Sequence, residues 1–349
     1  MLSESRLRHL LRSFADLRLG VVGDFFLDAY YDCDPRLDER SLETGRTCYQ
    51  VVRTRRQAGA AGTVAANLAA LGVGQVEAVG FCGDDGEGYE LRRAMQGLGL
   101  NLDGFLCRPD RFTPTYGKPC YVDTARTGLP VREELERLDT KNRRPTPRDL
   151  QDALIAHLEA RLPHWHGAVL LDQVSEPGCG VLTDRVRRFL AGQARRRPEQ
   201  ILLADSRQLI GLFRQVMIKP NQFEAARALG NPARHPPALR TSIAQAQALS
   251  RRSGRPVFLT LGEGGMLVAQ ASQVEHVPAY RVEGPIDPVG AGDSTSAALV
   301  ASLSAGAELP EAARLANLVA SITIQQLGTT GTASPAQIRR RYRQVRDAL

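Results

Sequence analysis

The sequence has few aromatic residues and no apolar run long enough to cross a membrane. Phe, Trp and Tyr make up 5% of the 349 residues, although hydrophobic residues as a whole reach 43%. Ala, Leu and Val carry most of the apolar content, and this mix favours helices packed on a buried parallel sheet over an all-β sandwich. No stretch approaches the ~20 apolar residues of a membrane span, and the amino terminus shows no signal-peptide pattern. We expect a cytoplasmic protein without a membrane partner.

Lysine is also scarce, and this bears on what the positive charge could attract. The formal net charge is +7, but only Lys118, Lys141 and Lys219 contribute lysine, and the remaining positive charge is arginine. The arginine runs at 195–197 and 339–341 contain no interleaved aromatic residues on which bases could stack. We therefore expect solvated arginine-rich faces and no nucleic-acid partner.

Short apolar runs alternate with helical patterns along most of the chain. This alternation implies βαβ units and predicts an α/β fold with a doubly wound, mainly parallel sheet flanked by helices. The predicted strands of this sheet lie at residues 19–23, 76–81, 168–171, 201–204, 216–218 and 257–261.

Two stretches, residues 30–57 and 109–139, break this alternation and read as extended strands. We expect them to form a small β-sheet that serves as a lid, on a core made of residues 1–29, 58–108 and 140–349. Long loops without a function are the alternative. Exposed strand edges invite pairing, so we also expect a homodimer formed through two lids.

A glycine-rich segment stands just before the helical pattern that starts at Ser294. Gly290, Ala291 and Gly292 are small enough for backbone N–H groups to converge on an anion, and the helix dipole favours negative charge there. Asp293 would lie beside such an anion, placed to accept a proton from an attacking hydroxyl. The segment lacks the features of a Walker loop and of a dinucleotide-binding fingerprint. A plain turn before a capped helix is the alternative.

The same segment resembles a family signature. The C-terminal signature of the ribokinase/PfkB family of carbohydrate kinases is similar to Asp287-Pro288-Val289-Gly290-Ala291-Gly292-Asp293. The family commonly has Thr at the second position, where this chain has Pro288. The resemblance implies a ribokinase-like fold, ATP as the phosphoryl donor, an anion hole at Gly290–Gly292 and a catalytic base at Asp293. It also implies a monovalent cation such as K⁺ near Asp287.

A second segment, Lys219–Glu224, resembles the family's Asn-x-x-Glu motif. The resemblance implies that Asn221 contributes to the nucleotide site and that Glu224 acts through water on Mg²⁺. Magnesium keeps most of its waters and takes oxygen ligands, which suits a carboxylate. A helix-capping pair formed by Asn221 and Glu224 is a second interpretation, and the two are compatible.

A glycine-rich turn at 260–265 and the helix that starts near Pro310 complete the expected nucleotide pocket by resemblance. Polar residues one turn apart on that helix could flank the adenine, although ordinary polar positions on a helix face are the alternative. The segment Gly328–Gly331 resembles the loop that closes over the adenine. The residues expected in this pocket are Thr260, Gly262, Gly265, Asn317 and Ser321.

The expected sugar pocket lies at the carboxyl end of the first predicted strand, where open α/β sheets bind ligands. Asp24 and Asp28 follow that strand, and carboxylates accept several hydroxyl hydrogens of a polyol. Gly59, Ala60 and Thr63 match the family's first glycine-rich motif. Two of these positions depart from it, because Ala60 and Thr63 replace the usual Gly and Asn.

The amino-terminal layout and residues 113–122 are closest in pattern to the heptose-phosphate kinases of the family. A phosphorylated substrate would need basic groups near the lid, and the candidates are Arg53, Arg55, Arg56, Lys118 and Arg126. Asp172 is retained from that branch, but the lysine that accompanies it there is missing. We predict ATP-dependent phosphorylation of a sugar or sugar-phosphate hydroxyl, with a heptose phosphate among the candidate substrates. A nucleoside or other small-alcohol kinase and a catalytically silent sugar or nucleotide sensor are the alternatives.

Overall fold

The computed structural model describes residues 2–346. Its main sheet is made of β1 (Arg18–Gly23), β6 (Gln75–Gly83), β7 (Asn101–Arg108), β11 (Gly167–Asp172), β12 (Ile201–Ser206), β13 (Met217–Ile218), β14 (Val257–Thr260), β15 (Met266–Gln270) and β16 (Gln273–Val277). Within the described residues their order is β16-β15-β14-β13-β12-β11-β1-β6-β7. Pairing is parallel from β14 to β7, whereas β15 and β16 are antiparallel. The predicted α/β fold with a mainly parallel sheet is confirmed.

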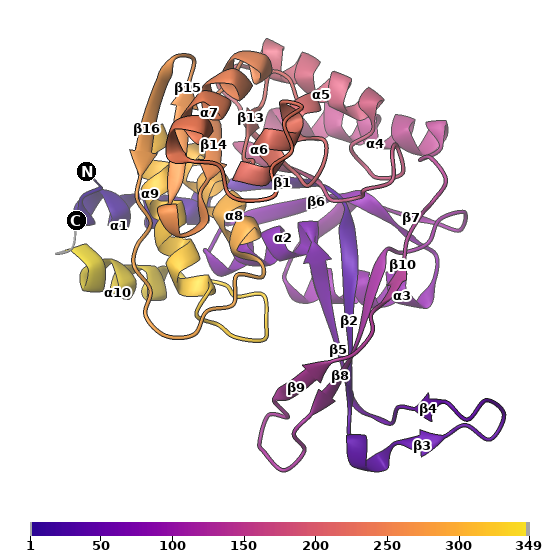
Figure 1. Cartoon of the computed structure of the whole chain (residues 1–349). Helices are drawn as coiled ribbons and strands as arrows, with labels where there is room; N and C mark the ends of the chain where they lie inside the picture. The colour runs from indigo at the N-terminus through magenta and orange to yellow at the C-terminus, as the bar shows by residue number, and fades with distance from the viewer. Residues whose placement is uncertain (1, 347–349) are drawn as a thin grey trace.

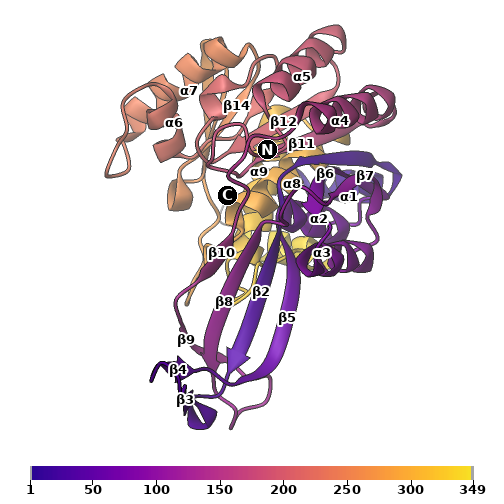
Figure 2. The same cartoon turned by 90° about the vertical axis from the view of Figure 1, so that its right-hand side faces the viewer.

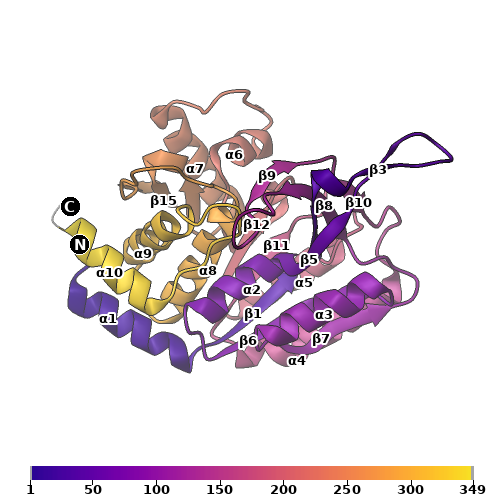
Figure 3. The ribbon, with the colours of Figure 1, turned by 90° about the horizontal axis from the view of Figure 1, so that it is seen from below.

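Helices cover both faces of this sheet (Figures 1 and 3). One face carries α1 (Glu4–Ser13), α2 (Ala61–Ala70), α3 (Gly86–Gly97), α8 (Ala291–Ser304), α9 (Leu309–Thr323) and α10 (Pro335–Val345). The other carries α4 (Arg148–Arg161), α5 (Asp184–Arg196), α6 (Gln222–Ala228) and α7 (Leu239–Ser253). No helix within residues 2–346 has the length and apolar character needed to cross a membrane.

The central strands are apolar on both faces because each face has its own core. Val21 and Val22 are neighbours in β1, yet their side chains belong to the two different cores. All six residues of β11 are buried. A continuous apolar run of this kind is what a parallel strand covered on both sides requires. The sequence analysis did not single out β7, the β15–β16 hairpin or α10.

A second sheet projects from the core as an arm (Figures 1 and 2). It consists of β2 (Phe25–Cys33), β5 (Val51–Ala60), β8 (Thr115–Val122), β9 (Val131–Glu134) and β10 (Leu138–Thr140). Its order is β10-β8-β2-β5 with β9 paired to β8, so β5 lies at an edge. The two segments expected to form a lid therefore do pair with each other. The strands of the first segment start at Phe25 and end at Ala60, which extends the sheet into the two neighbouring core segments, and β10 of the second segment ends at Thr140.

A buried carboxylate fastens the arm across β2 and β5. The Asp32 side chain is fully buried and pairs with Arg53 at 2.6 Å and with Arg55 at 2.9 Å. These hydrogen bonds hold the pKa of Asp32 below its usual value, although burial alone would raise it. The hairpin of β3 (Glu39–Arg40) and β4 (Thr47–Cys48) extends from the tip of the arm.

Candidate active site

Two cavities lie at the carboxyl ends of the parallel strands, and both reach the turn before α8. The first, which we call the lid cavity, has a volume of about 370 Å³ and is lined by Gly290 and Asp293. The second, the core cavity, has a volume of about 660 Å³ and is lined by Ala291 and Gly292. A group that passes from one cavity to the other must therefore pass this turn.

The turn exposes backbone N–H groups at the start of α8. Gly290 has a φ of 79°, in the left-handed region that glycine adopts without strain. The Ala291 N–H donates to the Pro288 carbonyl at 3.1 Å, whereas the N–H groups of Gly292 and Asp293 have no acceptor within residues 2–346. Two free amides at a helix amino terminus favour an anion. Of the residues expected to form the anion hole, Ala291 thus already uses its amide within the turn.

Asp293 lies partly buried at the foot of the lid cavity. Burial, followed by the nearby carboxylate of Asp205, raises its pKa to about 7, while Lys219 and Arg207 act in the opposite direction. A carboxyl group in this range is ionised in a substantial fraction of molecules near neutral pH and can accept a proton from a hydroxyl. The first turn of α8 therefore combines free amides with a candidate base.

A buried ion pair lies behind Asp293. Lys219 Nζ is 3.0 Å from Asp205 Oδ2, and both side chains are less than 10% exposed. Ser296 Oγ donates to the same Asp205 oxygen at 2.8 Å, which ties β12 to α8. The sequence analysis did not assign Asp205 or Lys219 to the site. Asp205 could have been identified from its position, because it directly follows a predicted strand and ligands bind at the carboxyl ends of such strands.

Glu224 and Asn221 form the capping box that was one of the two interpretations. Asn221 Oδ1 accepts from the Phe223 and Glu224 N–H groups at 2.9 Å, and Glu224 Oε2 accepts from the Asn221 N–H at 2.8 Å. The second carboxylate oxygen of Glu224 has no such bond. Burial and then Asp205 raise the pKa of Glu224 to about 7, against Lys219.

The carboxylates near Lys219 suit a magnesium ion that keeps most of its waters better than a metal ion held by protein ligands on all sides. Asp205, Glu224 and Asp293 all act electrostatically on Lys219, so three carboxylates face one buried cation. Within residues 2–346 no three acidic, His or Cys side chains form a metal cage. Magnesium needs no such cage, because it binds through one or two carboxylates, waters and substrate phosphates.

The core cavity brings together five of the six residues expected to bind a nucleotide, whereas Asn221 is not among its lining residues. Thr260, Gly262, Gly265, Asn317 and Ser321 all line it. Asn317 Nδ2 donates to the Val277 and Pro278 carbonyls at 3.1 and 3.0 Å, so this side chain also fixes the wall of the cavity. Much of the remaining lining comes from residues 279–286, a connection that no sequence motif indicated.

The lid cavity contains most of the residues expected to bind a sugar. Asp28, Ala60, Thr63 and Lys118 line it, and Lys118 Nζ lies 3.0 Å from Asp28 Oδ1. Gly59 leaves room for the aspartate, because a Cβ at this position would lie 2.5 Å from Asp28 Oδ2. The absence of a side chain at Gly59 therefore positions Asp28 in the cavity.

Asp24 is not among the residues that line the lid cavity. Its carboxylate accepts from the backbone N–H groups of Gln173, Val174 and Val181 at 2.8–3.1 Å. Burial raises its pKa above the usual value, and these three hydrogen bonds act against that rise. Asp24 thus anchors the loop after β11, and this loop brings Gln173 to the cavity.

Asp287 joins the turn to a later loop. Its carboxylate accepts from the Val289 N–H at 3.0 Å and from the Gly328 N–H at 3.1 Å. The residues Gly328, Thr329 and Thr330 line the lid cavity. The loop that was expected over the adenine therefore borders the lid cavity, next to Asp293.

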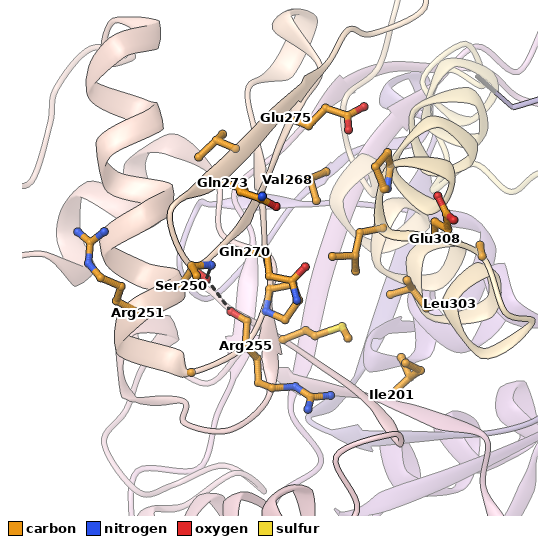
Figure 4. A pocket seen from close by; sticks show the side chains of 18 residues that line it. Ile201, Ser250, Arg251, Arg255, Val268, Gln270, Gln273, Glu275, Leu303 and Glu308 are labelled. Atoms are coloured by element: carbon orange, nitrogen blue, oxygen red, sulfur yellow. Dashed lines mark hydrogen bonds between the residues drawn. The ribbon is translucent and has the colours of Figure 1, made fainter.

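A third and larger cavity lies elsewhere, at the amino ends of β12, β13 and β14 (Figure 4). It measures about 1260 Å³, but its charged side chains are largely engaged. Glu275 pairs with Arg314 at 2.8 Å, Glu308 caps α9, and Arg255 donates to the Pro198 carbonyl at 2.6 Å. No convergent catalytic group faces this hollow, so the two smaller cavities form the candidate site.

Comparison with known proteins agrees with this geometry. The family model described as pfkB family carbohydrate kinase matches residues 21–337. The bifunctional protein HldE of Trichlorobacter lovleyi is 30% identical over 332 residues, which cover 94% of this chain and 63% of that protein. The bifunctional protein HldE of Caulobacter vibrioides is 32% identical over 347 residues, or 96% of this chain and 67% of that protein. The chain thus spans about two thirds of the length of these relatives.

Solved structures share the fold at lower identity. The ribokinase of Arabidopsis thaliana, solved with ribose and ATP, has a TM-score of 0.67 and 17% identity, covering 93% of this chain and 98% of that one. Phosphofructokinase-2 of Escherichia coli has a TM-score of 0.68 and 18% identity, covering 95% and 100%. With the family match over most of its length, this chain belongs to the pfkB family of carbohydrate kinases and is a sugar kinase of that family.

Proposed function

We propose that this sugar kinase transfers the γ-phosphoryl group of ATP to a hydroxyl of a sugar phosphate, with a heptose phosphate as the first candidate. The observation that carries the proposal is the meeting of two cavities at one turn that holds free amides and Asp293. The core cavity would hold the nucleotide, and the lid cavity would hold the acceptor. The relatives named HldE support a heptose phosphate as acceptor.

In this mechanism Asp293 takes the proton of the acceptor hydroxyl as its oxygen attacks the γ-phosphorus. A new oxygen–phosphorus bond forms, the bond from the γ-phosphorus to the bridging oxygen breaks, and ADP leaves with that electron pair. The amides of Gly292 and Asp293 would hold phosphoryl oxygens at the helix terminus. The lid would exclude water, so that ATP is not lost to hydrolysis. When bound, magnesium would neutralise phosphate charge near Glu224.

The acceptor panel is the primary test of this function. The purified chain is assayed for ADP release with ATP and magnesium, and with heptose phosphates, unphosphorylated sugars, other sugar phosphates and nucleosides. We expect the best kcat/KM with a heptose phosphate, by about tenfold or more over the unphosphorylated sugar, because four basic side chains line the lid cavity and a charged phosphate would interact with them. A nucleoside as best acceptor would contradict the acceptor assignment. Binding of ATP and sugar without ADP release would contradict the kinase mechanism.

The role of Asp293 predicts a large effect of a neutral isostere. Asp293→Asn should lower kcat by about 10²–10⁴-fold, because general-base catalysis is lost while the shape is retained. Asp16→Asn is the matched control, since Asp16 is exposed at a distance from both cavities, and it should behave like the wild type. Turnover of Asp293→Asn near the wild-type value would contradict the role of Asp293 as the catalytic base.

The same role predicts a pH dependence in the wild-type enzyme. The pKa of Asp293 is raised to about 7, so the base is protonated and inactive below that pH and ionised above it. The kcat/KM for the acceptor should therefore fall by about tenfold per pH unit below pH 7. A profile that stays flat between pH 5.5 and 8 would show that another group takes the proton.

We include a monovalent cation beside Asp287 in the proposal. Its carboxylate bridges the turn and the 328–330 loop with one hydrogen bond on each oxygen, so lone pairs remain for a cation that would hold the two loops together. Activity in potassium should exceed activity in tetramethylammonium at equal ionic strength. Equal rates in the two salts would remove the cation from the mechanism.

We further propose that two chains pair through their lids. Val51 and Val52 are 47% and 42% exposed on β5, an edge strand of the lid, and exposed apolar edges invite pairing. Light scattering should give about twice the 38.1 kDa of one chain. Val51→Asp should yield the monomer, whereas Leu239→Asp, at an equally exposed position on α7, should leave the dimer intact. A wild-type mass near 38 kDa would refute the dimer.

A further inference from the structure

The cations that line the lid cavity differ in whether they have a partner. Arg55 pairs with Asp32 at 2.9 Å, Lys118 with Asp28 at 3.0 Å and Arg137 with Asp139 at 2.7 Å. The fourth cation of the lining is Arg207. Its guanidinium has no hydrogen-bond or ion-pair partner within residues 2–346. Three positive charges of the cavity are thus compensated by the protein, and one is left for a ligand.

The backbone holds Arg207 in place although its side chain is free. Its N–H donates to the Asp172 carbonyl at 3.3 Å, and its carbonyl accepts from Arg227 Nη1 at 2.8 Å. It follows Asp205 by two residues, at the carboxyl end of β12. The side chain therefore starts from a rigid strand end behind the turn and extends into the cavity that contains Asp293.

Arg207 and the candidate base Asp293 line the same cavity. The guanidinium lowers the pKa of Asp293 against the rise caused by burial and Asp205. A cation that affects Asp293 also lies near the place where the attacking oxygen and the γ-phosphorus would meet. At that place negative charge spreads over the phosphoryl oxygens as the group is transferred.

We propose that Arg207 binds oxygens of the phosphoryl group during its transfer, opposite the amides of Gly292 and Asp293. This proposal rests on the proposed kinase function and names a residue that the motifs of the sequence did not reveal. An arginine keeps its charge at all relevant pH values and presents several N–H donors in a fork that matches a phosphoryl group. Being exposed and solvated, it remains unpaired at little cost until a ligand arrives.

The test compares Arg207→Gln and Arg207→Lys with Arg188→Gln. Arg188 is the matched control, because it is exposed on α5 and lines neither cavity. Arg207→Gln should lower kcat by about 10²-fold while the KM values for ATP and acceptor change less than about threefold, since the contact forms mainly in the transition state. Arg207→Lys should recover part of the loss, and Arg188→Gln should match the wild type.

A second measurement needs no acceptor and separates this proposal from the proposed function. Calorimetry with magnesium and ADP, with and without aluminium fluoride, uses the fluoride complex as a mimic of the phosphoryl group in transfer. Aluminium fluoride should tighten ADP binding in the wild type, and Arg207→Gln should lose most of this gain while binding ADP alone equally well.

Two outcomes would overturn the proposal. The first is an unchanged kcat in Arg207→Gln together with an unchanged gain from aluminium fluoride. The second is a loss confined to the KM of phosphorylated acceptors, because Arg207 would then bind the phosphate of the acceptor. If the wild type shows no turnover with any acceptor, the proposed function fails, whereas the fluoride measurement still decides whether Arg207 binds a phosphoryl group.

Discussion

The buried ion pair between Lys219 and Asp205 holds the candidate site together. It joins the carboxyl end of β12 to the residue after β13, and Ser296 adds α8 to the same carboxylate. Removing one partner would leave the other charged and buried, which is far more costly than never having had the pair. Asp293 lies three residues before Ser296 on α8. The ion pair therefore fixes the position of the first turn of α8, with Asp293 and its free N–H groups, relative to the main sheet.

The carboxylates around this ion pair are hard to ionise, mainly because they are buried and secondly because Asp205 is negatively charged, whereas Lys219 acts in the opposite direction. One buried lysine faces Asp205, Glu224 and Asp293, and the pKa values of Glu224 and Asp293 are raised to about 7 by burial and by Asp205. A divalent cation near Glu224 would reverse this effect, because a bound cation favours the ionised form of its neighbours. In the proposed mechanism, magnesium bound near Glu224 would therefore favour the ionised form of Asp293.

Periodicity and local motifs predicted the main sheet and the turn before α8. They did not predict which residues distant in the sequence contact one another at the site. Apolar runs identify the central strands because these strands are buried on both faces. The segment Gly290–Asp293 could be recognised from the sequence because its expected role depends on backbone N–H groups and on small residues at a helix start. Asp24 was expected in the sugar pocket, but the sequence does not show to which side of a strand end a carboxylate turns. Asp205 and Arg207 were missed because their roles come from residues far away in the sequence.

The two departures from the family motif, Ala60 and Thr63, both line the lid cavity. Ala60 has a φ of 53° and a ψ of −116°, a positive-φ conformation outside the left-handed helical region that costs a residue with a Cβ about 1–3 kcal/mol. The surroundings hold it there, because the next N–H, of Ala61, donates to the Asp24 carbonyl at 3.0 Å. Its methyl group narrows the lid cavity, and Thr63 presents a shorter polar group than the usual Asn. The methyl group of Ala60 and the charged pair Asp28–Lys118 thus line one cavity, so an acceptor bound there in the proposed mechanism would meet an apolar surface and a charged one.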